Sequence, residues 1–193
     1  DPGFAQVPVA ELLSEHYAEQ ARKLINPQRV AKVLPEPIME HSDTTYLCVV
    51  DNERNAVSFI NSIYSEFGSG VMAPASGVML QNRANCFRLD PEHPNCIAPL
   101  KRPMHTIMPA MLMQNARPVA PFGVMGGDYQ PMGQVHVLTG IIDFGLDPQE
   151  ALDAARAFYS DGKLHVENGI PASVREELSR YGHELADQTE PLG

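Results

Sequence analysis

Residues 45–51 read TYLCVVD and residues 55–63 read NAVSFINSI, and these two runs decide how the chain folds. Both are rich in β-branched and aromatic side chains, which favour strands, and a polar Asn-Glu-Arg triplet at 52–54 separates them. We therefore predict a β-hairpin that begins just after Thr44. The sequence changes at this threonine to runs that favour strands, so Thr44 marks a boundary between two segments of the chain.

The sequence upstream of this hairpin is helical and then linker-like. Residues 8–24 place apolar side chains at helical spacing, which predicts one helix. A second, short helix is expected after Asn26, which would cap it, with Pro27 at its first position. Residues 34–43 hold two prolines among polar groups and are expected to form an exposed linker. Neither an initiator Met nor a signal peptide precedes Asp1, so we expect a piece of a longer protein.

Downstream of the hairpin, further strands give way to helices. Residues 81–106 are rich in Asn, Pro and His, and an irregular stretch of this length is usually functional. Asp128 is expected to cap the helix that follows it, and Gly182 to end the last helix. The other elements are expected as strands at 107–113, 119–125 and 164–167 and as helices at 129–144, 147–157 and 171–181. This order predicts sheets covered by helices.

Composition excludes several classes of function. The 193 residues are 44% hydrophobic and carry a formal net charge of -10, which allows a core but offers no basic stripe for nucleic acid. No run approaches the roughly 18 apolar residues of a membrane span. No His, Cys, Asp and Glu cluster has metal-ligand spacing, and no glycine-rich phosphate loop occurs, so neither a metal nor a cofactor is predicted.

The three cysteines, Cys48, Cys86 and Cys96, leave the redox compartment undecided. An odd number in a chain of this size does not indicate a disulfide framework. Free thiols are the favoured interpretation, and a single bridge between Cys86 and Cys96 is the alternative.

Five short motifs follow one another along the chain, and each alone is weak evidence for a family. They are Asn55-Ala56-Val57-Ser58, Phe67-Gly68-Ser69-Gly70, Gly77-Val78-Met79-Leu80-Gln81-Asn82, Lys101-Arg102-Pro103 and Met125-Gly126-Gly127. In this order they resemble the small subunit of γ-glutamyltransferases, over about residues 4–185. Runs at 58–62, 80–83 and 89–95 are most similar to a bacterial branch labelled γ-glutamyltransferase-like or cephalosporin acylase. The resemblance implies an N-terminal-nucleophile (Ntn) hydrolase, an α+β protein built as an αββα sandwich that this fragment leaves incomplete.

The resemblance also implies that the chain cuts itself before Thr44. Asp43 would then end the large subunit, so that residues 1–43 are its last, helical part and residues 44–193 are the small-subunit catalytic domain, truncated at its C-terminus. Cleavage frees the Thr44 α-amine, whose reference pKa near 8 lets it act as general base for its own hydroxyl.

Three further residues support this chemistry by resemblance. Gly126 and Gly127 match the family's glycine pair, whose backbone N–H groups form the oxyanion hole. Ser62 stands where the family has a Thr whose hydroxyl contacts the nucleophile, and serine keeps that hydroxyl.

The substrate pocket departs from the family pattern. γ-Glutamyltransferases hold the α-amino group of the substrate with Asn, Gln and Asp, and the matching positions here are Tyr64, Arg83 and Cys86. The family's Ser-Ser pair, which contacts the α-carboxylate, reads His105-Thr106, and His105 is expected to make a neutral hydrogen bond at the pocket rather than to act in catalysis. Arg83 would repel an ammonium group and attract a carboxylate, which favours an acyl group such as glutaryl.

Three functions remain open at this stage. The leading one is an amidohydrolase or acyltransferase that cleaves or transfers γ-glutamyl-type amides, glutathione-like, through an acyl-Thr44 intermediate. The alternatives are a glutaryl- or cephalosporin-type acylase and an unprocessed or truncated domain without activity. The expected partners are a small-molecule amide, the remainder of the large subunit, and a second copy that covers exposed strands. The bacterial resemblance leaves cytoplasm and periplasm both open.

Overall fold

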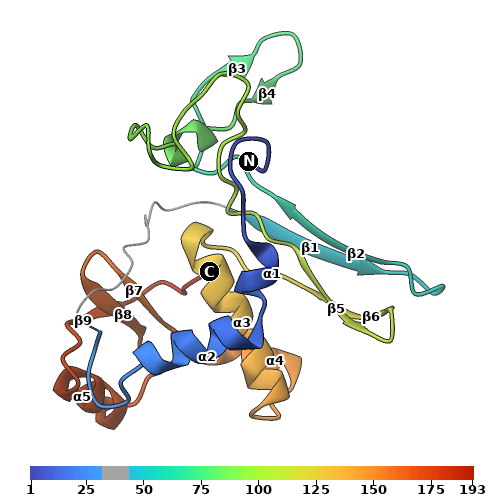
Figure 1. The fold of residues 1–193 in the computed structure, drawn as a ribbon. Coiled ribbons are helices and arrows are strands. Elements are labelled where there is room, and N and C mark those ends of the chain that lie inside the picture. The colour runs from blue at the N-terminus through green and yellow to red at the C-terminus, as the bar shows by residue number, and fades with distance from the viewer. Residues whose placement is uncertain (32–43) are drawn as a thin grey trace.

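The protein combines short helices with small, separate sheets (Figure 1). The computed structural model describes residues 1–31 and 44–193, so the linker expected at 34–43, including Asp43, lies outside the described residues. The helices are α1 (Val9–Leu12), α2 (Glu15–Leu24), α3 (Gln130–Ile142), α4 (Pro148–Asp153) and α5 (Ala172–Arg180), with short 3-10 turns η1 (Arg83–Cys86) and η2 (Gly127–Tyr129). The strands are β1 (Thr45–Val50), β2 (Ala56–Asn61), β3 (Met72–Ala73), β4 (Val78–Met79), β5 (Ala110–Gln114), β6 (Arg117–Phe122), β7 (Ala157–Ser160), β8 (Lys163–Glu167) and β9 (Leu185–Gln188).

The hairpin predicted from the sequence is formed by β1 and β2. Its antiparallel register places Thr45 opposite Asn61 at the open end. The Asp51 carboxylate closes the turn, since it accepts hydrogen bonds from the backbone N and from the Nδ2 of Asn55, each at 2.8 Å. The side chains of a turn Asp and Asn therefore fix the register that positions everything at the open end.

The β1-β2 hairpin packs beside the second hairpin, β5-β6 (Figure 1). The Ser58 hydroxyl joins them by donating to Phe122 O at 3.2 Å, and the Tyr46 hydroxyl lies 3.2 Å from the Ser58 hydroxyl. A Cβ at Gly123 would lie 2.6 Å from the Tyr46 ring, so glycine lets the two hairpins approach closely. The opposite face of β1-β2 is apolar and exposed, and it consists of Leu47, Val49, Val57 and Phe59.

The upstream helix differs from the prediction, because two helices stand where one was expected. The Ser14 hydroxyl accepts a hydrogen bond from Tyr17 N at 3.1 Å and so starts α2 anew. The short helix expected after Asn26 is also wrong. Asn26 Oδ1 accepts instead from Gln28 N at 2.9 Å, a local turn, and Val30 N then donates to Tyr181 O at 2.8 Å.

The C-terminal half confirms the predicted helices but changes their ends. The α4 helix begins with a capping box between Asp147 and Glu150, yet it ends at Asp153 rather than 157 because Ala157 pairs with Val166 in the sheet.

Other helix and strand boundaries also differ from the prediction. The cap residue of α3 is Tyr129, without a side-chain cap bond, so the prediction that Asp128 caps this helix is wrong. Gly182, at φ 99°, follows α5 as expected. The strand expected at 164–167 is β8; its partners β7 and β9, and the small hairpin β3-β4, were not predicted. β8 and β9 are parallel, with α5 between them in sequence.

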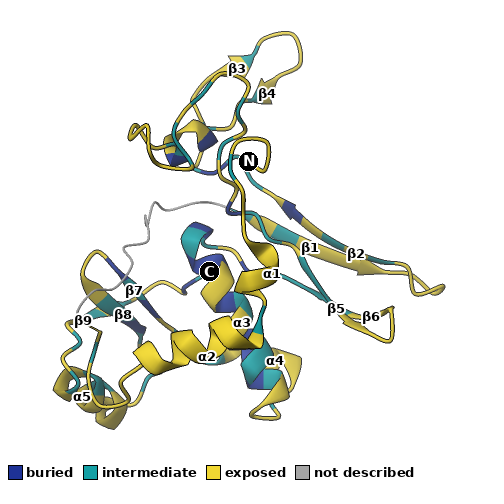
Figure 2. Cartoon of the chain, in the orientation of Figure 1, coloured by how far each residue is buried: buried dark blue, intermediate teal, exposed yellow. Residues whose placement is uncertain are grey.

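The core is small and lies around α3 and the turn before it (Figure 2). One cluster joins Val124, Val137 and Ala151, and a second joins Tyr129, Phe158 and Leu192. The α2 helix has no buried residue, and Figure 2 shows it exposed along its length. Cys48, Cys86 and Cys96, all within the described residues, form no disulfide, which agrees with the interpretation favoured from the sequence. None of the helices in the described ranges has the length and apolar character to cross a bilayer.

Candidate active site

Thr44 lies directly before β1 and is half-buried. Because Thr45 pairs with Asn61 in an antiparallel register, Thr44 falls one position beyond the last pair, opposite Ser62. The predicted nucleophile and its predicted hydroxyl partner therefore occupy facing positions at the open end of the hairpin. Asp43, on the other side of the expected cleavage bond, is outside the described residues.

Tyr64 follows Ser62 in an unusual backbone conformation. It has φ 81°, a region that non-glycine residues rarely adopt, and its side chain is only 4% exposed. Its backbone N donates to Ser62 Oγ at 3.0 Å. A strained, buried residue beside a polar site is often held there by function, which agrees with a role for Tyr64 in the site.

Arg83 is the centre of the site. It is only 2% exposed, and its Nη1 donates to Thr106 Oγ1 at 3.3 Å while its Nη2 donates to Ser62 O at 3.4 Å. Its guanidinium lies 5.5 Å from the centroid of the Tyr64 ring. The structure thus brings together four residues that the sequence assigned to one site: Ser62, Tyr64, Arg83 and Thr106.

The electrostatics of Arg83 are unusual for so buried a cation. Within residues 1–31 and 44–193 no carboxylate pairs with it, and its contacts are a hydroxyl, a carbonyl and an aromatic ring. Burial lowers the pKa of Arg83, while neighbouring Cys86 and Tyr64 raise it. A buried charge is normally paired, because an unpaired one is costly, so this arrangement is suited to receiving an anion.

His105 stands beside this cluster but is itself exposed. Although the residue is exposed, partial desolvation of its ring lowers the pKa of His105, and the positive charges of Arg83 and Arg102 lower it further. The neutral imidazole expected from the sequence is thus the form that this environment favours.

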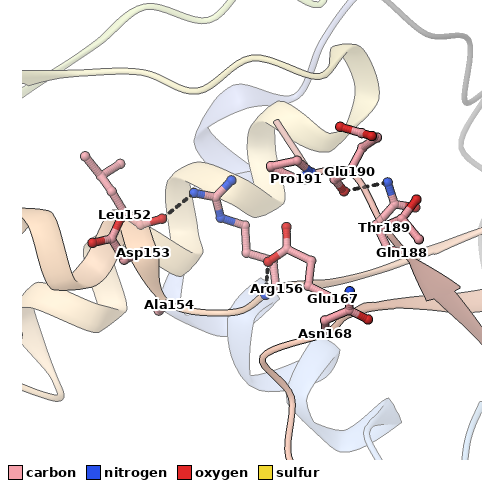
Figure 3. A pocket seen from close by; sticks show the side chains of 10 residues that line it. All are labelled: Leu152, Asp153, Ala154, Arg156, Glu167, Asn168, Gln188, Thr189, Glu190 and Pro191. Carbon is pink, nitrogen blue, oxygen red and sulfur yellow. Dashed lines mark hydrogen bonds between the residues drawn. The ribbon is translucent and has the colours of Figure 1, made fainter.

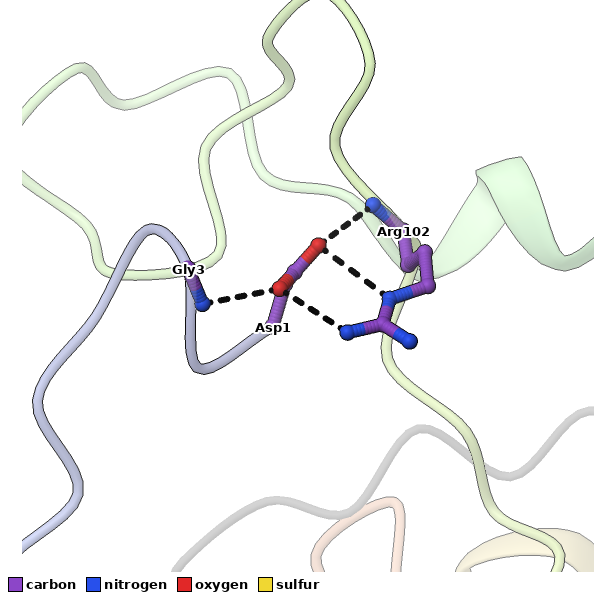
Figure 4. A network of polar contacts seen from close by, with 3 residues as sticks. All are labelled: Asp1, Gly3 and Arg102. Atoms are coloured by element: carbon purple, nitrogen blue, oxygen red, sulfur yellow. Dashed lines mark hydrogen bonds and ion pairs between the residues drawn. The ribbon is translucent and has the colours of Figure 1, made fainter.

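Arg102 is tied to the start of the described chain (Figure 4). The Asp1 carboxylate accepts from Arg102 N at 3.0 Å and forms an ion pair with its guanidinium at 3.4 Å. Gly3 N donates to the same carboxylate at 2.9 Å, and Lys101 Nζ lies 5.3 Å from the centroid of the Phe4 ring. Residues 1–4 therefore rest on the segment that leads into His105 and Thr106.

Gly126 and Gly127 form the glycine turn, with φ 99° and 56°. Two successive left-handed residues are accessible to glycine at little cost, and Gly127 is buried. Within the described residues neither backbone N–H of the pair donates a hydrogen bond. A pair of adjacent, unused N–H groups is what an oxyanion hole requires.

Some features of this region were not found from the sequence. Gln81 accepts from the backbone N of Arg83 and so fixes the start of η1. A cavity of about 320 Å³, which Thr44 does not line, lies between the end of α4 and the β8-β9 edge (Figure 3). Arg156 and Glu167 line it, and no motif marks either residue. The described residues hold no group of three or more His, Cys, Asp and Glu arranged for a metal ion.

The solved structures to which this chain is similar define its class of protein. The chain matches the crystal structure of cephalosporin acylase from Bacillus halodurans with a TM-score of 0.88 and 41% identity, over 98% of this chain and 34% of that one. The predicted Ntn-hydrolase α+β fold is confirmed, as part of such a fold. The family model for gamma-glutamyltranspeptidase matches residues 1–193, and the chain belongs to this family.

Two curated relatives extend the comparison. The glutathione hydrolase-like YwrD proenzyme of Bacillus subtilis (strain 168) is 37% identical over 201 residues, which cover all of this chain and 38% of that protein. The oxamate amidohydrolase proenzyme of Klebsiella pneumoniae is 41% identical over 160 residues, 78% of this chain and 30% of that protein. The chain thus spans about a third of the length of these relatives.

Proposed function

We propose that this chain carries the nucleophile of a self-processing amidohydrolase, and that this nucleophile is Thr44. The observation that carries the proposal is the position of Thr44 before β1, opposite Ser62, in a chain of this family. The cut would fall between Asp43 and Thr44, so that residues 1–43 end the large subunit and residues 44–193 begin the small one. The word proenzyme in the names of both relatives supports such processing.

The chemistry runs in two stages. In the first, the Thr44 hydroxyl attacks the Asp43 carbonyl and the 43/44 peptide bond breaks, so that the peptide becomes an ester and the Thr44 amine is freed. Water then hydrolyses this ester, which releases the Asp43 carboxylate and restores the Thr44 hydroxyl. In the second, this amine takes the hydroxyl proton while the oxygen attacks the substrate amide, and it then protonates the departing amine. The N–H groups of Gly126 and Gly127 stabilise the oxyanion, a contribution of about 3 kcal/mol for one donor. Water, or an acceptor amine, finally removes the acyl group from Thr44.

Arg83 supports an acyl group that carries a carboxylate. Its guanidinium is buried among neutral groups, and a carboxylate would supply the missing negative charge with charge-assisted hydrogen bonds. Thr106, held by Arg83 Nη1, would add a hydroxyl to the same anion. Amide hydrolysis of a carboxylate-bearing substrate also agrees with the name oxamate amidohydrolase given to one relative.

Hydrolysis or transfer of γ-glutamyl groups is the second candidate function, and the name glutathione hydrolase-like, given to the Bacillus subtilis relative, favours it. A γ-glutamyl group carries the same carboxylate plus an ammonium. Arg83, Tyr64 and Cys86 offer that ammonium no carboxylate, so we place amine-free acyl groups such as glutaryl first. Hydrolysis rates of a glutaryl anilide and a γ-glutamyl anilide separate the two candidates.

The exposed apolar face of β1-β2 supports the remainder of the large subunit as a partner. Leu47, Val49, Val57 and Phe59 stay 44–56% exposed although they line one face of a sheet. Covering such a face with another layer is the usual architecture of packed sheets. A homodimer through this face is the alternative, and the mass of the processed assembly in solution distinguishes them.

Substitution of Thr44 tests the proposed function. Thr44→Ala should abolish both cleavage at 43/44 and turnover, whereas Thr44→Ser keeps a hydroxyl and should retain part of both. Thr45→Ala is the matched control, since Thr45 is the neighbouring exposed hydroxyl, and should remain active. Intact-mass analysis and anilide hydrolysis give the readouts. A single uncut mass for the unsubstituted protein would instead favour the dormant precursor, and cleavage of Thr44→Ala at the same bond would exclude the mechanism.

A further inference from the structure

The glycine turn rests directly on the backbone of a segment 66 residues further along the chain, at Leu192 and Gly193. A Cβ on Gly126 would lie 3.1 Å from Gly193 Cα, and a Cβ on Gly193 would lie 2.8 Å from Met125 O. Two backbones in such close contact cannot move independently. The place of Gly193 therefore sets one wall of the turn that presents the Gly126 and Gly127 amides.

Side-chain packing reinforces this contact. Leu192, only 4% exposed, packs with Tyr129 and Phe158, and the two rings meet edge to face with centroids 5.3 Å apart. Burial raises the pKa of Tyr129 to about 12, so its phenol stays neutral. Tyr129 directly follows the glycine turn, and this cluster anchors its C-terminal side.

Arg156 and Glu167 hold the Leu192–Gly193 backbone from the other side. The Arg156 Nη1 donates to Leu192 O and, at 3.2 Å, to Gly193 O. Glu167 Oε1 accepts from Leu192 N at 2.7 Å, and Glu167 Oε2 accepts from Arg156 N at 2.8 Å. The guanidinium and the carboxylate thus each form hydrogen bonds with backbone groups and not with each other. Together they bind both the N–H and the C=O of Leu192.

The second Nη atom of the same guanidinium group binds the backbone of α4. Arg156 Nη2 donates to Leu152 O at 2.6 Å, at the end of α4, and the dashed line in Figure 3 marks this bond. The guanidinium therefore bridges α4 and the Leu192–Gly193 segment with charge-assisted bonds, which are roughly twice as strong as neutral ones. Loss of either charge would release the segment on which the glycine turn rests.

We infer that Arg156 and Glu167 are positioning residues of the oxyanion hole, acting through Leu192 and Gly193 on the Gly126-Gly127 turn. The inference rests on the proposed role of these glycines. Stabilisation by an oxyanion hole depends on donors placed close to the developing charge, so a shift of a few tenths of an ångström weakens it without removing any catalytic group. Neither Arg156 nor Glu167 touches the substrate in this scheme.

A structural role alone would not affect the oxyanion, and Arg175 offers the matched comparison. Arg175 also donates to backbone carbonyls, those of Val166, Glu167 and Ile170, and forms an ion pair with Asp187 at 2.5 Å. Those contacts hold α5 on the β7-β9 sheet. The one to Glu167 is to its backbone O and not to the carboxylate that bonds Leu192, and none of them reaches Leu192, Gly193 or the glycine turn. Arg175→Met and Arg156→Met therefore remove comparable bonds from neighbouring places with different expected consequences.

The experiment compares an ester substrate with its thionoester, in which sulfur replaces the carbonyl oxygen. Sulfur is larger and a weaker hydrogen-bond acceptor, so a well-fitted oxyanion hole discriminates against it. Arg156→Met and Glu167→Gln should lower kcat by about tenfold to a hundredfold with KM little changed, and should reduce the ester preference. Arg175→Met should keep both kcat and the ester preference, even where its melting temperature falls.

Rates are referred to the cleaved fraction measured by mass, and Arg156→Lys tests whether one retained donor rescues part of kcat. Unchanged ester preference in Arg156→Met and in Glu167→Gln, or equal losses in Arg175→Met, would overturn the inference. If Arg156→Met does not fold, Glu167→Gln decides alone, because it keeps the shape of the side chain and loses the charge and one of the two acceptor oxygens. Failure of the proposed function would show in a different measurement, because turnover would then survive Thr44→Ala. The inference about Arg156 would still stand in that case if Arg156→Met reduced the ester preference.

Discussion

Arg83 and Thr106 are 23 residues apart in sequence, yet Arg83 Nη1 donates to Thr106 Oγ1 at 3.3 Å and both residues are buried. This bond closes the long irregular stretch from 81 to 106 onto the end of β2, where Ser62 O accepts from Arg83 Nη2. The loop therefore brings a cation to Ser62, the residue that follows β2 at the open end of the hairpin.

We expect Arg83→Gln to lose activity selectively on substrates whose acyl group carries a carboxylate. Glutamine keeps hydrogen-bonding capacity but removes the charge, and a charge-assisted bond is worth about 1.5–3 kcal/mol, or roughly tenfold to a hundredfold in kcat/KM. The measurement compares glutaryl and butyryl anilides in each variant. Arg88→Gln, an exposed arginine on the same loop, is the control. Equal losses on the two anilides would show that Arg83 serves only the fold.

His105 should titrate below its ordinary range, and Arg102→Gln should raise its pKa. Burial is the largest cause of the depressed pKa, followed by Arg83 and Arg102, so removing one positive charge relieves part of the shift. An NMR titration of the imidazole Cε1–H measures it directly. Arg117→Gln, an exposed arginine at the start of β6, is the control and should leave the pKa of His105 unchanged.

The same depressed pKa predicts how stability depends on pH. The unfolded chain binds the His105 proton near pH 6.5, before the folded protein does. The unfolded state then holds more protons, so the free energy of unfolding falls as the pH drops below about 6.5 and further until the folded pKa is passed. His105→Gln should flatten this part of the pH profile in urea unfolding. A profile that is equally steep in the variant would contradict the assignment.

The sequence predicted the parts of this site that depend on local pattern or on family motifs. The β1-β2 hairpin follows from two runs rich in β-branched and aromatic residues with a polar triplet between them, and the register then places Thr44 opposite Ser62. The contacts of Arg83 with Thr106 and Ser62 depend on how a long loop returns, which no short pattern encodes. The pairing of β8 with β9 was not predicted for a similar reason, since β9 reaches β8 only after α5. The β7 strand is a local partner of β8, joined to it by a two-residue turn, and was missed in the sequence. The single helix expected at 8–24 failed because a local Ser14 cap outweighed helical periodicity.

Gly126→Ala should cost activity out of proportion to stability. At φ 99° a Cβ would lie 3.1 Å from Gly193 Cα, a backbone atom that cannot easily yield, so the turn must shift. Gly145→Ala is the matched control, because Gly145 has φ 70° but open space around its would-be Cβ. Both should lose about 1 kcal/mol of stability through the left-handed backbone alone. Only Gly126→Ala should lower kcat, and equal kcat in the two variants would argue against the glycine turn as the oxyanion hole.

The Asp1–Arg102 contact should hold the upstream piece on the loop after cleavage at 43/44. The Asp1 side chain is only 6% exposed and also accepts from Gly3 N and Arg102 N, whereas the Arg102 side chain is 72% exposed. An enclosed carboxylate with several donors is screened less than a surface pair, so a double-mutant cycle of Asp1→Ala and Arg102→Gln should give a coupling of about 1 kcal/mol.

The Lys163–Glu184 pair is the reference for this cycle, since its charged atoms are closer, 3.0 Å against 3.4 Å, but its side chains are 48% and 68% exposed. Its coupling should lie near the lower end of the roughly 0.2–1 kcal/mol seen for surface pairs, and 0.5 M salt should reduce it further. Because the Asp1 contact orders the segment that ends in His105 and Thr106, Asp1→Ala should also raise KM for the carboxylate-bearing anilide, while Glu184→Ala should not. A coupling no larger than that of the reference pair, with KM unchanged, would mean that residues 1–4 merely lie on the loop and do not help to shape the pocket.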